Sequence, residues 1–110
     1  MKRFVYLISP SSIYKKFYID LEKVLATKKV KFFQLRLKKT SNNKIVKIAK
    51  KVKILTNKHN VKLIINDSPE TCKKINADGC HLGQQDSSIF KARKYLKNKI
   101  IGATCHNSKK

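Results

Sequence analysis

The hydrophobic positions of the chain fall into two kinds of segment that alternate along its length. Some are short, nearly continuous apolar runs that end abruptly in polar residues, which is typical of buried strands. Others are longer stretches in which apolar residues recur every three or four positions, which indicates amphipathic helices. The short runs predict five strands, at residues 4–8, 30–35, 61–65, 79–82 and 100–104.

The longer stretches predict a helix between each pair of strands. The first carries its apolar stripe from Ile13 to Leu25, and the second is capped by Ser41 or Asn42. A short third helix opens with Ser68 as N-cap and Pro69 as first helical residue, and runs to about residue 75. The fourth is capped by Ser87 or Ser88 and carries Ile89, Ala92 and Leu96.

This βαβαβαβαβ order predicts an α/β fold with a parallel sheet and right-handed crossovers. The pattern fits an open doubly wound sheet or the first five strands and four helices of a (β/α)8 TIM barrel, and periodicity does not separate the two. No helix follows the strand at 100–104. We therefore expect residues 1–110 to form one partial domain of a longer fold.

The composition shows a strong excess of basic residues, with a formal net charge of +21 from 27 basic and six acidic residues. Only three basic residues are arginines, whose planar fork favours specific recognition of bases and phosphates. The lysines are spread along the whole chain, which indicates solvated lysine faces and no specific nucleic-acid partner. A basic RNA-binding module remains an alternative, although the aromatic residues fall mostly inside the predicted strands and helices.

Cysteines and hydropathy indicate the cellular compartment. The three cysteines lack any CxxC or zinc spacing and are expected to be reduced thiols of a cytosolic protein. The N-terminal apolar run is too short for a signal peptide, and no segment approaches the length of a membrane span. We expect a cytoplasmic protein without membrane contact.

Polar side chains that can bind ligands or take part in catalysis follow four of the predicted strands. Because the carboxyl ends of parallel strands meet at one edge of the sheet, these side chains are expected to converge. Carboxylates can hold Mg²⁺, while Arg and Lys neutralise phosphate charge, so the set suits a diphosphate with Mg²⁺. The set comprises Gln34, Arg36 and Lys38; Asn66 and Asp67; Gln84 and Asp86; and Thr104 and His106.

Several members of this set, and three residues near them, also have a purely structural interpretation. Asp67 precedes Glu70 by three residues and can be the N-cap of a capping box, and Asp86 can likewise cap the next helix. Lys38 is one of 24 lysines. His81 fits a histidine in or near the core, and Cys80 and Cys105 fit small buried hydrophobic residues.

Taken in order, the segments resemble thiamine phosphate synthases. Tyr6-Leu7-Ile8-Ser9-Pro10 resembles the opening strand of that family, and Gln34-Leu35-Arg36-Leu37-Lys38 resembles its Gln-x-Arg-x-Lys signature. Residues 63–67 match its Ile-Asn-Asp motif, residues 77–86 match Ala-Asp-Gly-x-His-x-Gly-Gln-x-Asp, and residues 100–106 resemble Ile-Gly-x-Ser-x-His.

The resemblance implies a TIM-barrel transferase of thiamine biosynthesis. Such an enzyme joins hydroxymethylpyrimidine diphosphate to a thiazole phosphate and releases diphosphate with the help of Mg²⁺. By resemblance, Asp67 and Asp86 would bind Mg²⁺, and Gln34, Arg36, Lys38 and Asn66 would hold the pyrimidine diphosphate. Thr104 would lie near the pyrimidine and the diphosphate, and Arg36, Lys38 and Thr104 would form the catalytic set.

The sequence departs from the family pattern in one respect. The family motifs that grip the thiazole phosphate, a Gly-x-x-Phe-x-Thr-x-Thr-Lys loop and later glycine-rich loops, do not occur in the sequence. We therefore expect only the half-site for the pyrimidine diphosphate, and self-association through exposed barrel edges. The related thiazole tautomerase is a second alternative, against which Arg36, Lys38, Asp67 and Asp86 argue together.

Overall fold

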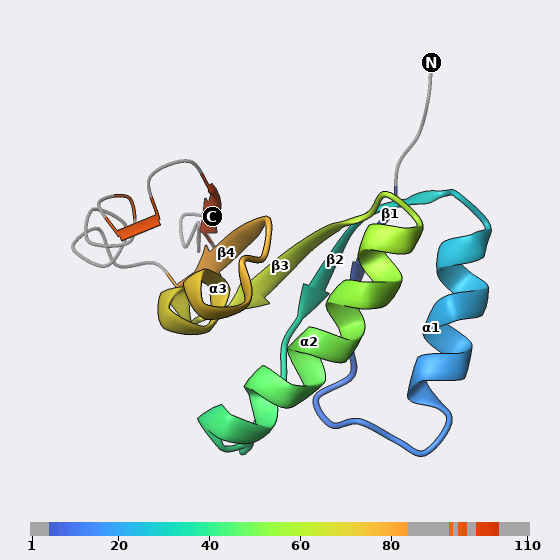
Figure 1. Ribbon diagram of the computed structural model, residues 1–110, viewed down its shortest axis with the longest axis horizontal. Helices are drawn as coiled ribbons and strands as arrows, with labels where there is room; N and C mark the ends of the chain where they lie inside the picture. Colours follow the sequence, from blue (N-terminus) through green and yellow to red (C-terminus); the bar gives the residue numbers. More distant parts are fainter. Residues whose placement is uncertain (1–4, 84–92, 94, 97–98, 104–110) are drawn as a thin grey trace, which may run out of the picture.

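The computed structural model describes residues 5–83, 93, 95–96 and 99–103. Its elements follow the predicted alternation of strands and helices (Figure 1). The five strands are β1 (Val5–Ile8), β2 (Val30–Leu35), β3 (Lys62–Asn66), β4 (Gly79–Leu82) and β5 (Ile100–Ala103). Their bounds agree with the predicted ones to within one residue, apart from Phe4 and Thr104, which lie outside the described residues.

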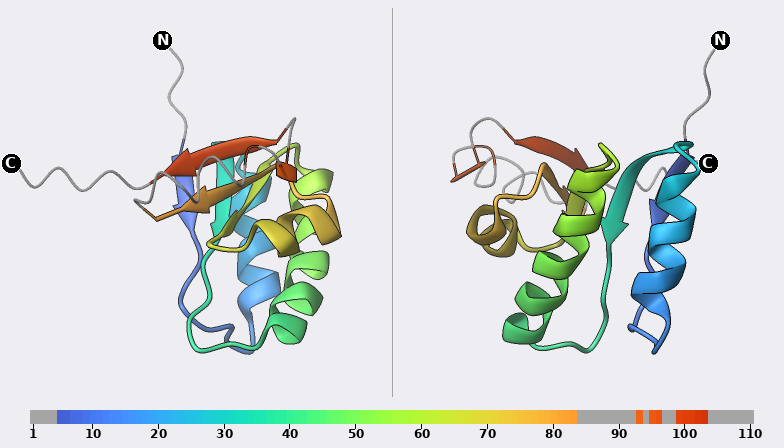
Figure 2. Two further views of the ribbon diagram at one scale, coloured as in Figure 1. Left: turned by 90° about the vertical axis from the view of Figure 1, so that its left-hand side faces the viewer. Right: turned by 45° about the vertical axis from the view of Figure 1, so that its right-hand side comes forward.

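All five strands are parallel and follow one another across the sheet in the order β1-β2-β3-β4-β5. A doubly wound sheet reverses its strand order at a switch point and carries helices on both faces. Here the order never reverses, and the helices lie together on one side of the sheet (Figure 2). This is the arrangement of strands in a (β/α)8 barrel, which confirms the prediction of a partial barrel.

Three helices cover this side of the sheet: α1 (Phe17–Ala26), α2 (Asn42–Lys58) and α3 (Pro69–Ile75). The hydrophobic core lies between them and the alternate strand residues that point toward them. Leu21 and Leu25 of α1 and Val52 of α2 are buried there with Phe33 of β2 and Leu63 of β3. The predicted fourth helix lies for the most part outside the described residues; of it, Arg93, Tyr95 and Leu96 have helical backbone.

The helix ends follow from local side chains. The hydroxyl of Ser41 accepts a hydrogen bond from the backbone N–H of Lys44, as predicted for the N-cap of α2. Helix α1, however, begins at Phe17 rather than near Ile13. Its N-cap is Lys16, which makes no side-chain capping bond, and the basic side chains there oppose the positive end of the helix dipole.

Within the described residues, the opposite face of the sheet has no helix over it. Several large apolar side chains are therefore exposed there: Tyr6 is 48% exposed, Ile8 50% and Ile100 43%. In a closed barrel this face lines the interior, where side chains from the strands pack in layers. Gly79 on β4 also belongs to this face, and a Cβ there would stand 2.5 Å from the carbonyl oxygen of Ile100, so the close approach of β4 and β5 requires glycine.

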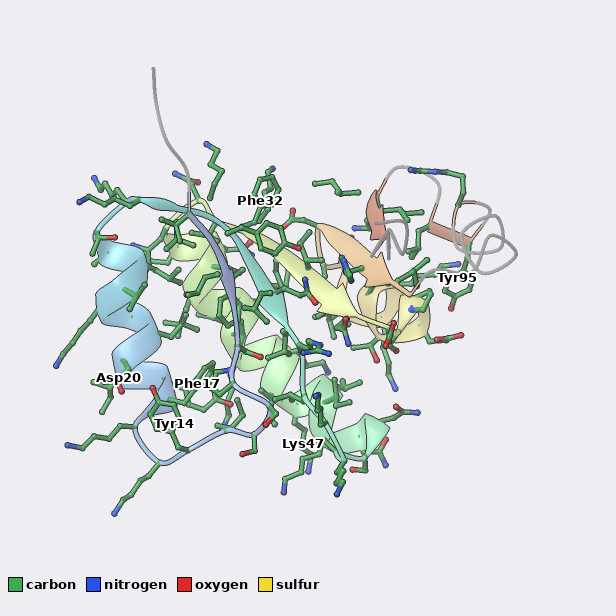
Figure 3. All side chains as sticks on the ribbon, turned by 180° about the vertical axis from the view of Figure 1, so that it is seen from behind. Tyr14, Phe17, Asp20, Phe32, Lys47 and Tyr95 are labelled. Carbon is green, nitrogen blue, oxygen red and sulfur yellow. The ribbon has the colours of Figure 1, made fainter. Side chains whose placement is uncertain are left out.

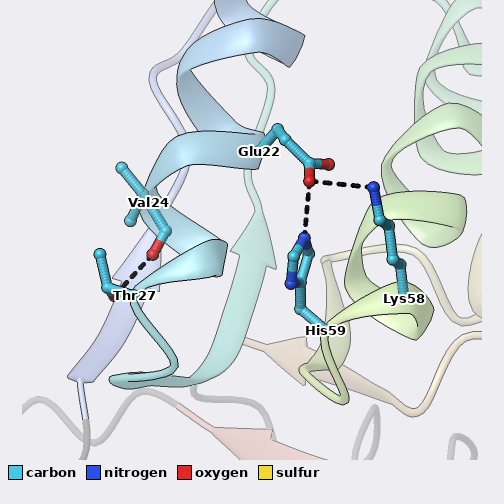
Figure 4. Close-up of polar contacts among 5 residues, drawn as sticks. All are labelled: Glu22, Val24, Thr27, Lys58 and His59. Atoms are coloured by element: carbon cyan, nitrogen blue, oxygen red, sulfur yellow. Dashed lines mark hydrogen bonds and ion pairs between the residues drawn. The ribbon is translucent and has the colours of Figure 1, made fainter.

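A polar cluster joins α1 to α2 on the outside of the molecule (Figure 4). Oε2 of Glu22 lies 2.9 Å from Nε2 of His59 and 3.1 Å from Nζ of Lys58. Beside it, the hydroxyl of Thr27 donates a hydrogen bond of 2.7 Å to the carbonyl of Val24 and helps to close the end of α1. One carboxylate of a chain that has only six acidic residues thus holds two basic groups.

Two cysteines are buried between α3 and the sheet. Cys72 and Cys80 are free thiols, and burial raises the pKa of Cys72 to about 11 and that of Cys80 to about 12. Thiols with such pKa values stay protonated at neutral pH and are inert. For Cys80 this confirms the interpretation as a small buried side chain, while Cys105 lies outside the described residues.

Candidate active site

The candidate site lies at the carboxyl ends of β2 and β3, which are neighbours in the sheet. Leu35 of β2 is paired with Ile65 of β3, and Arg36 and Asn66 are the residues that follow this pair. Gln34 lies within β2, and Lys38 and Asp67 lie just past the two strands. Five of the predicted residues therefore gather at one edge of two adjacent strands, as the parallel topology requires.

Gln34 lies on the face of the sheet that the helices leave uncovered. It is buried, with 3% of its surface exposed, and its Nε2 donates a hydrogen bond of 3.0 Å to the hydroxyl of Tyr6 on β1. The ring of Tyr6 is stacked on that of Phe32, with 5.6 Å between the ring centres; Phe32 is labelled in Figure 3. This contact fixes the Gln34 amide, whose oxygen atom is a hydrogen-bond acceptor.

Ser9 joins the end of β1 to the end of β2. Its hydroxyl accepts a hydrogen bond of 2.9 Å from the backbone N–H of Arg36, and its own N–H donates to the carbonyl of Gln34 at 2.9 Å. A further hydrogen bond joins the two segments two residues later, where the N–H of Lys38 donates to the carbonyl of Ser11 at 2.9 Å. The backbone of this segment is thus held in place, while the side chains of Arg36 and Lys38 are exposed and free to meet a ligand.

Asp67 does not serve as a helix cap. The N-cap of α3 is Ser68, whose hydroxyl accepts from the N–H of Thr71 at 3.2 Å, and Pro69 follows at the start of the helix. The prediction of a Ser68-Pro69 start is therefore confirmed, and the capping-box interpretation of Asp67 is wrong. Ser68 takes the cap because Asp67 adopts the left-handed conformation, with φ of 55°, one residue too early to reach the helix.

The backbone of Asp67 is tied to the neighbouring strand, and its carboxylate is exposed. Its N–H donates a hydrogen bond of 2.7 Å to the carbonyl of His81 on β4. Within the described residues its carboxylate accepts one weak hydrogen bond, from Nδ2 of Asn66 at 3.4 Å. A positive φ in a residue other than glycine is uncommon and often marks a functional position.

Asn66, His81 and Gly102 form one row across the uncovered face, on β3, β4 and β5. His81 is half-buried, and a Cβ on Gly102 would lie 3.4 Å from its Cδ2, so Gly102 lies directly beside the imidazole ring. His81 therefore belongs to the same layer of the sheet as the candidate residue Asn66 rather than to the core beneath the helices.

Asp78 lies at the other end of the sheet. It precedes β4, and its carboxylate accepts a hydrogen bond of 2.8 Å from the N–H of Leu63 near the start of β3. Asp78 thus has a structural role that is separate from the candidate site. The predicted residues Gln84, Asp86, Thr104 and His106 lie outside the described residues.

The donor set available for a metal ion is one of hard oxygen atoms. The exposed carboxylate of Asp67, which caps no helix, and the amide oxygen of Asn66 are ligands that suit Mg²⁺. Within the described ranges, no three His, Cys, Asp or Glu residues gather as a complete metal site. The described residues therefore fit Mg²⁺ as partial ligands, which is how this ion is usually held beside substrate phosphates.

Sequence reasoning missed the two residues that position this site, Tyr6 and Ser9. In the sequence both belong to the segment Tyr6-Leu7-Ile8-Ser9-Pro10, which indicates an opening strand and its end but no role for either side chain in the site. Their signal lies in the register, which pairs Ile8 with Gln34 and Tyr6 with Phe32, and register is not visible in one sequence.

The fold and the site together define a partial (β/α) barrel with a cluster of charged and amide groups at the carboxyl ends of its strands. A family model described as thiamine monophosphate synthase matches residues 5–110. The chain belongs to this family. A helix that could cross a membrane does not occur in the part of the chain that the structure describes.

Similar proteins support this assignment. The chain is 63% identical to a thiamine-phosphate synthase of Pelagibacter ubique over 97% of its own length and 52% of the relative's. It is 36% identical to a thiamine-phosphate synthase of Erythrobacter litoralis over 96% of its length and 51% of that relative's. A solved thiamine phosphate pyrophosphorylase from Pyrococcus furiosus has the same fold, with a TM-score of 0.80 at 22% identity, over 94% of this chain and 50% of that one. The chain thus spans about half the length of the relatives it matches.

Proposed function

We propose that this chain carries the pyrimidine-diphosphate half-site of a thiamine phosphate synthase. The complete reaction would join hydroxymethylpyrimidine diphosphate to a thiazole phosphate, giving thiamine phosphate and diphosphate. The observation that carries the proposal is the gathering of Gln34, Arg36, Lys38, Asn66 and Asp67 at the ends of two adjacent strands in a chain of this family.

The exposed cations take the charge of the diphosphate in this proposal. The Arg36 guanidinium can bind two phosphate oxygens at once, and the Lys38 ammonium adds a flexible point charge. Gln34, held by Tyr6, and Asn66 supply amide groups that orient the pyrimidine end. Because the charge on the leaving diphosphate grows as its bond to the pyrimidine methylene breaks, these cations favour departure.

Asp67, with Asp86 and Thr104 implied by the family motif, completes the half-site. Mg²⁺ would supply charge neutralisation on the diphosphate when bound, and Asp67 is the described residue that would hold it. No general base is required, because the attacking thiazole nitrogen has a free lone pair. The reaction class is therefore a transfer with loss of diphosphate, and the chain would act in the cytoplasm, where buried reduced thiols such as Cys72 and Cys80 are stable.

The test compares the chain alone with the chain supplied with a complementary half. The complementary half can be taken from the Pelagibacter ubique relative, as the part that follows the matched segment, and joined to residue 110 or added as a separate chain. We expect negligible thiamine phosphate formation by the 110-residue chain alone, because positioning a second substrate can lower a barrier by about 7–11 kcal/mol. We expect turnover in the joined protein.

Substitutions in the joined protein identify the half-site. Arg36→Ala should abolish most turnover, whereas Lys15→Ala, another exposed basic residue, should leave turnover intact. The 110-residue chain should bind the pyrimidine diphosphate weakly and only when Mg²⁺ is present. Robust turnover by the chain alone would overturn the proposal. Binding of the pyrimidine diphosphate that is equally strong with and without Mg²⁺ would also overturn it.

A further inference from the structure

The proposed half-site uses two basic side chains, Arg36 and Lys38, of the 27 in the sequence. Helix α2, Asn42–Lys58, carries six lysines and no acidic residue. We infer that the outer face of α2 binds the phosphate backbone of nucleic acids without sequence preference. This activity is separate from the proposed function and lies on another part of the molecule.

The binding face consists of Lys44, Lys47, Lys50 and Lys51, which we name the α2 lysine face. All four side chains are exposed, and Lys47 extends from the N-terminal half of the helix (Figure 3). Spacings of three, four and seven residues place side chains on the same side of a helix. The opposite side of α2 is fixed, because Ala49, Val52 and Thr56 are buried against the sheet.

No carboxylate neutralises this face within the described residues. The ion pairs among the described residues lie outside this face, where Glu22 pairs with Lys58 and His59 next to the end of α2. Lys53 donates to the carbonyl of Ile75, so it and Lys58 have partners of their own and are left out of the face. Lys51 lies over the ring of Tyr18 at 5.6 Å, a contact that leaves its charge in place.

The spacing of these charges suits a polyphosphate chain. Lys44 and Lys51 are seven residues apart, which is about 10 Å along a helix at 1.5 Å per residue. Duplex DNA carries one charge per about 1.7 Å of its axis, so several phosphates lie along that distance. Four lysines can therefore each meet a phosphate, and release of the counterions bound there favours association.

The chemistry of the face excludes readout of base sequence. Helix α2 contains neither arginine, whose fork pairs with guanine, nor an aromatic residue on which a base can stack. Lysines contact phosphates as flexible point charges, and phosphate contacts carry no sequence information. Binding through this face should therefore depend on salt and be insensitive to sequence.

An anionic membrane is a poorer match for the same face. A helix that lies in a membrane interface presents a broad apolar side to the lipid. The apolar side of α2 is buried in the core, and Ile54, which is 69% exposed, is the large hydrophobic residue of α2 that remains outside. Binding to a nucleic-acid backbone requires only exposed positive charges, and exposed lysines are what α2 presents to the solvent. We therefore favour nucleic acid over a membrane surface.

The experiment measures fluorescence anisotropy of two labelled 20-base-pair duplexes of unrelated sequence, between 50 and 200 mM KCl. The first variant replaces Lys44, Lys47, Lys50 and Lys51 with Gln, which has a similar helix propensity. The control replaces Lys15, Lys16, Lys23 and Lys29 with Gln, and so removes the same charge from exposed positions outside α2. Circular dichroism checks that both variants keep the helical content of the wild type.

We expect the wild type to bind both duplexes with equal affinity. In the first variant the negative slope of log affinity against log salt should become less steep by about 3 to 4, since each lost phosphate contact is worth about 0.9. Its affinity at 50 mM KCl should fall by more than about tenfold, and the control should lose much less. Binding of the pyrimidine diphosphate with Mg²⁺ should be the same in all three proteins, which separates this inference from the proposed function.

Three results would overturn the inference. Equal losses in the two variants would show that net charge alone attracts the duplex. Absence of duplex binding by the wild type at 50 mM KCl would show that the face does not bind nucleic acid. Binding to vesicles of anionic phospholipid that needs the α2 lysine face, without binding to the duplexes, would assign the face to a membrane surface.

Discussion

Asp78 and Leu63 are joined by two hydrogen bonds at the amino ends of β4 and β3. The carboxylate of Asp78 accepts from the N–H of Leu63 at 2.8 Å, and the N–H of Asp78 donates to the carbonyl of Leu63 at 3.0 Å. The carbonyl of Asp78 in turn accepts from the N–H of Ile100 at 3.0 Å. One residue therefore links the starts of three adjacent strands.

Removal of this carboxylate should destabilise the sheet without touching the candidate site. Asp78→Ala leaves the N–H of Leu63 without its acceptor in a partly buried position, and we expect a loss of about 1–3 kcal/mol in the free energy of unfolding. Asp78→Asn keeps an acceptor oxygen and should lose less. Urea denaturation at one fixed protein concentration measures both, and equal losses in the two variants would contradict the proposed hydrogen-bond role.

Ser9 should affect both stability and ligand binding. Ser9→Ala removes the acceptor of the Arg36 N–H, so we expect a loss of about 0.5–1.5 kcal/mol and weaker binding of the pyrimidine diphosphate in the presence of Mg²⁺. Ser9→Thr keeps the hydroxyl and serves as the control. Calorimetric titration gives the affinity, and an unchanged affinity in Ser9→Ala would show that Ser9 does not position Arg36.

Asp67 should show opposite effects on stability and on function. Asp67→Gly relieves the left-handed backbone at φ of 55°, and we expect stability to be unchanged or higher by up to about 1 kcal/mol. The same change should weaken the Mg²⁺-dependent binding of the pyrimidine diphosphate, because the carboxylate that would hold the ion is lost. Asp67→Asn tests the carboxylate separately, since asparagine also tolerates this conformation. Retention of Mg²⁺-dependent binding in both variants would exclude Asp67 as a metal ligand.

Glu22 should make stability depend on pH on the acid side. Hydrogen bonds with His59 and then Lys58 hold the pKa of its carboxyl below its ordinary value of 4.5. A carboxyl whose pKa is lower in the folded chain stabilises the fold above the unfolded pKa, and this contribution disappears as the pH falls through the folded pKa. Urea midpoints of the wild type and of Glu22→Gln should therefore differ at pH 7, and the difference should shrink as the pH falls below 4.5 and through the folded pKa. A constant difference across this range would rule out the linkage.

The uncovered face of the sheet should cause self-association. Tyr6 and Ile8 are about half exposed on β1, and exposed apolar patches on a sheet promote contacts between molecules. Ile8→Lys should lower the average mass measured by analytical ultracentrifugation. Ile54→Lys is the matched control, because Ile54 is exposed on α2, away from the sheet. A wild-type chain that sediments as a single monomer would disprove this prediction.

The elements of the fold were predictable because they depend on local signals. Val30–Leu35 is a continuous β-rich run, Ser41 precedes a helical stripe, and Ser68-Pro69 marks a helix start, and each of these appears in the structure where it was predicted. Periodicity did not give the order of the strands, because an element carries the same pattern in an open sheet and in a barrel. The sheet order itself separated the two.

The candidate site was predictable only as a set of side chains. The positions of Gln34, Arg36 and Asn66 follow from where their strands end. The bond from Gln34 to Tyr6 depends on strand register, and the positive φ of Asp67 depends on how the loop meets β4. Such features arise from tertiary contacts between distant segments, which a single sequence does not display.

The sequential order of the strands has a consequence for how the chain is made. Each of the described strands β2 to β5 pairs with the strand that precedes it in the sequence, so this edge of each strand has its partner before the strand itself is synthesised. Contacts between segments that are close in the sequence carry a small loop-closure entropy cost and favour fast folding. Chains also begin to fold from the N-terminus during translation. Each new strand and helix can therefore dock on an edge already formed as it leaves the ribosome, and the sheet can grow in the direction of synthesis.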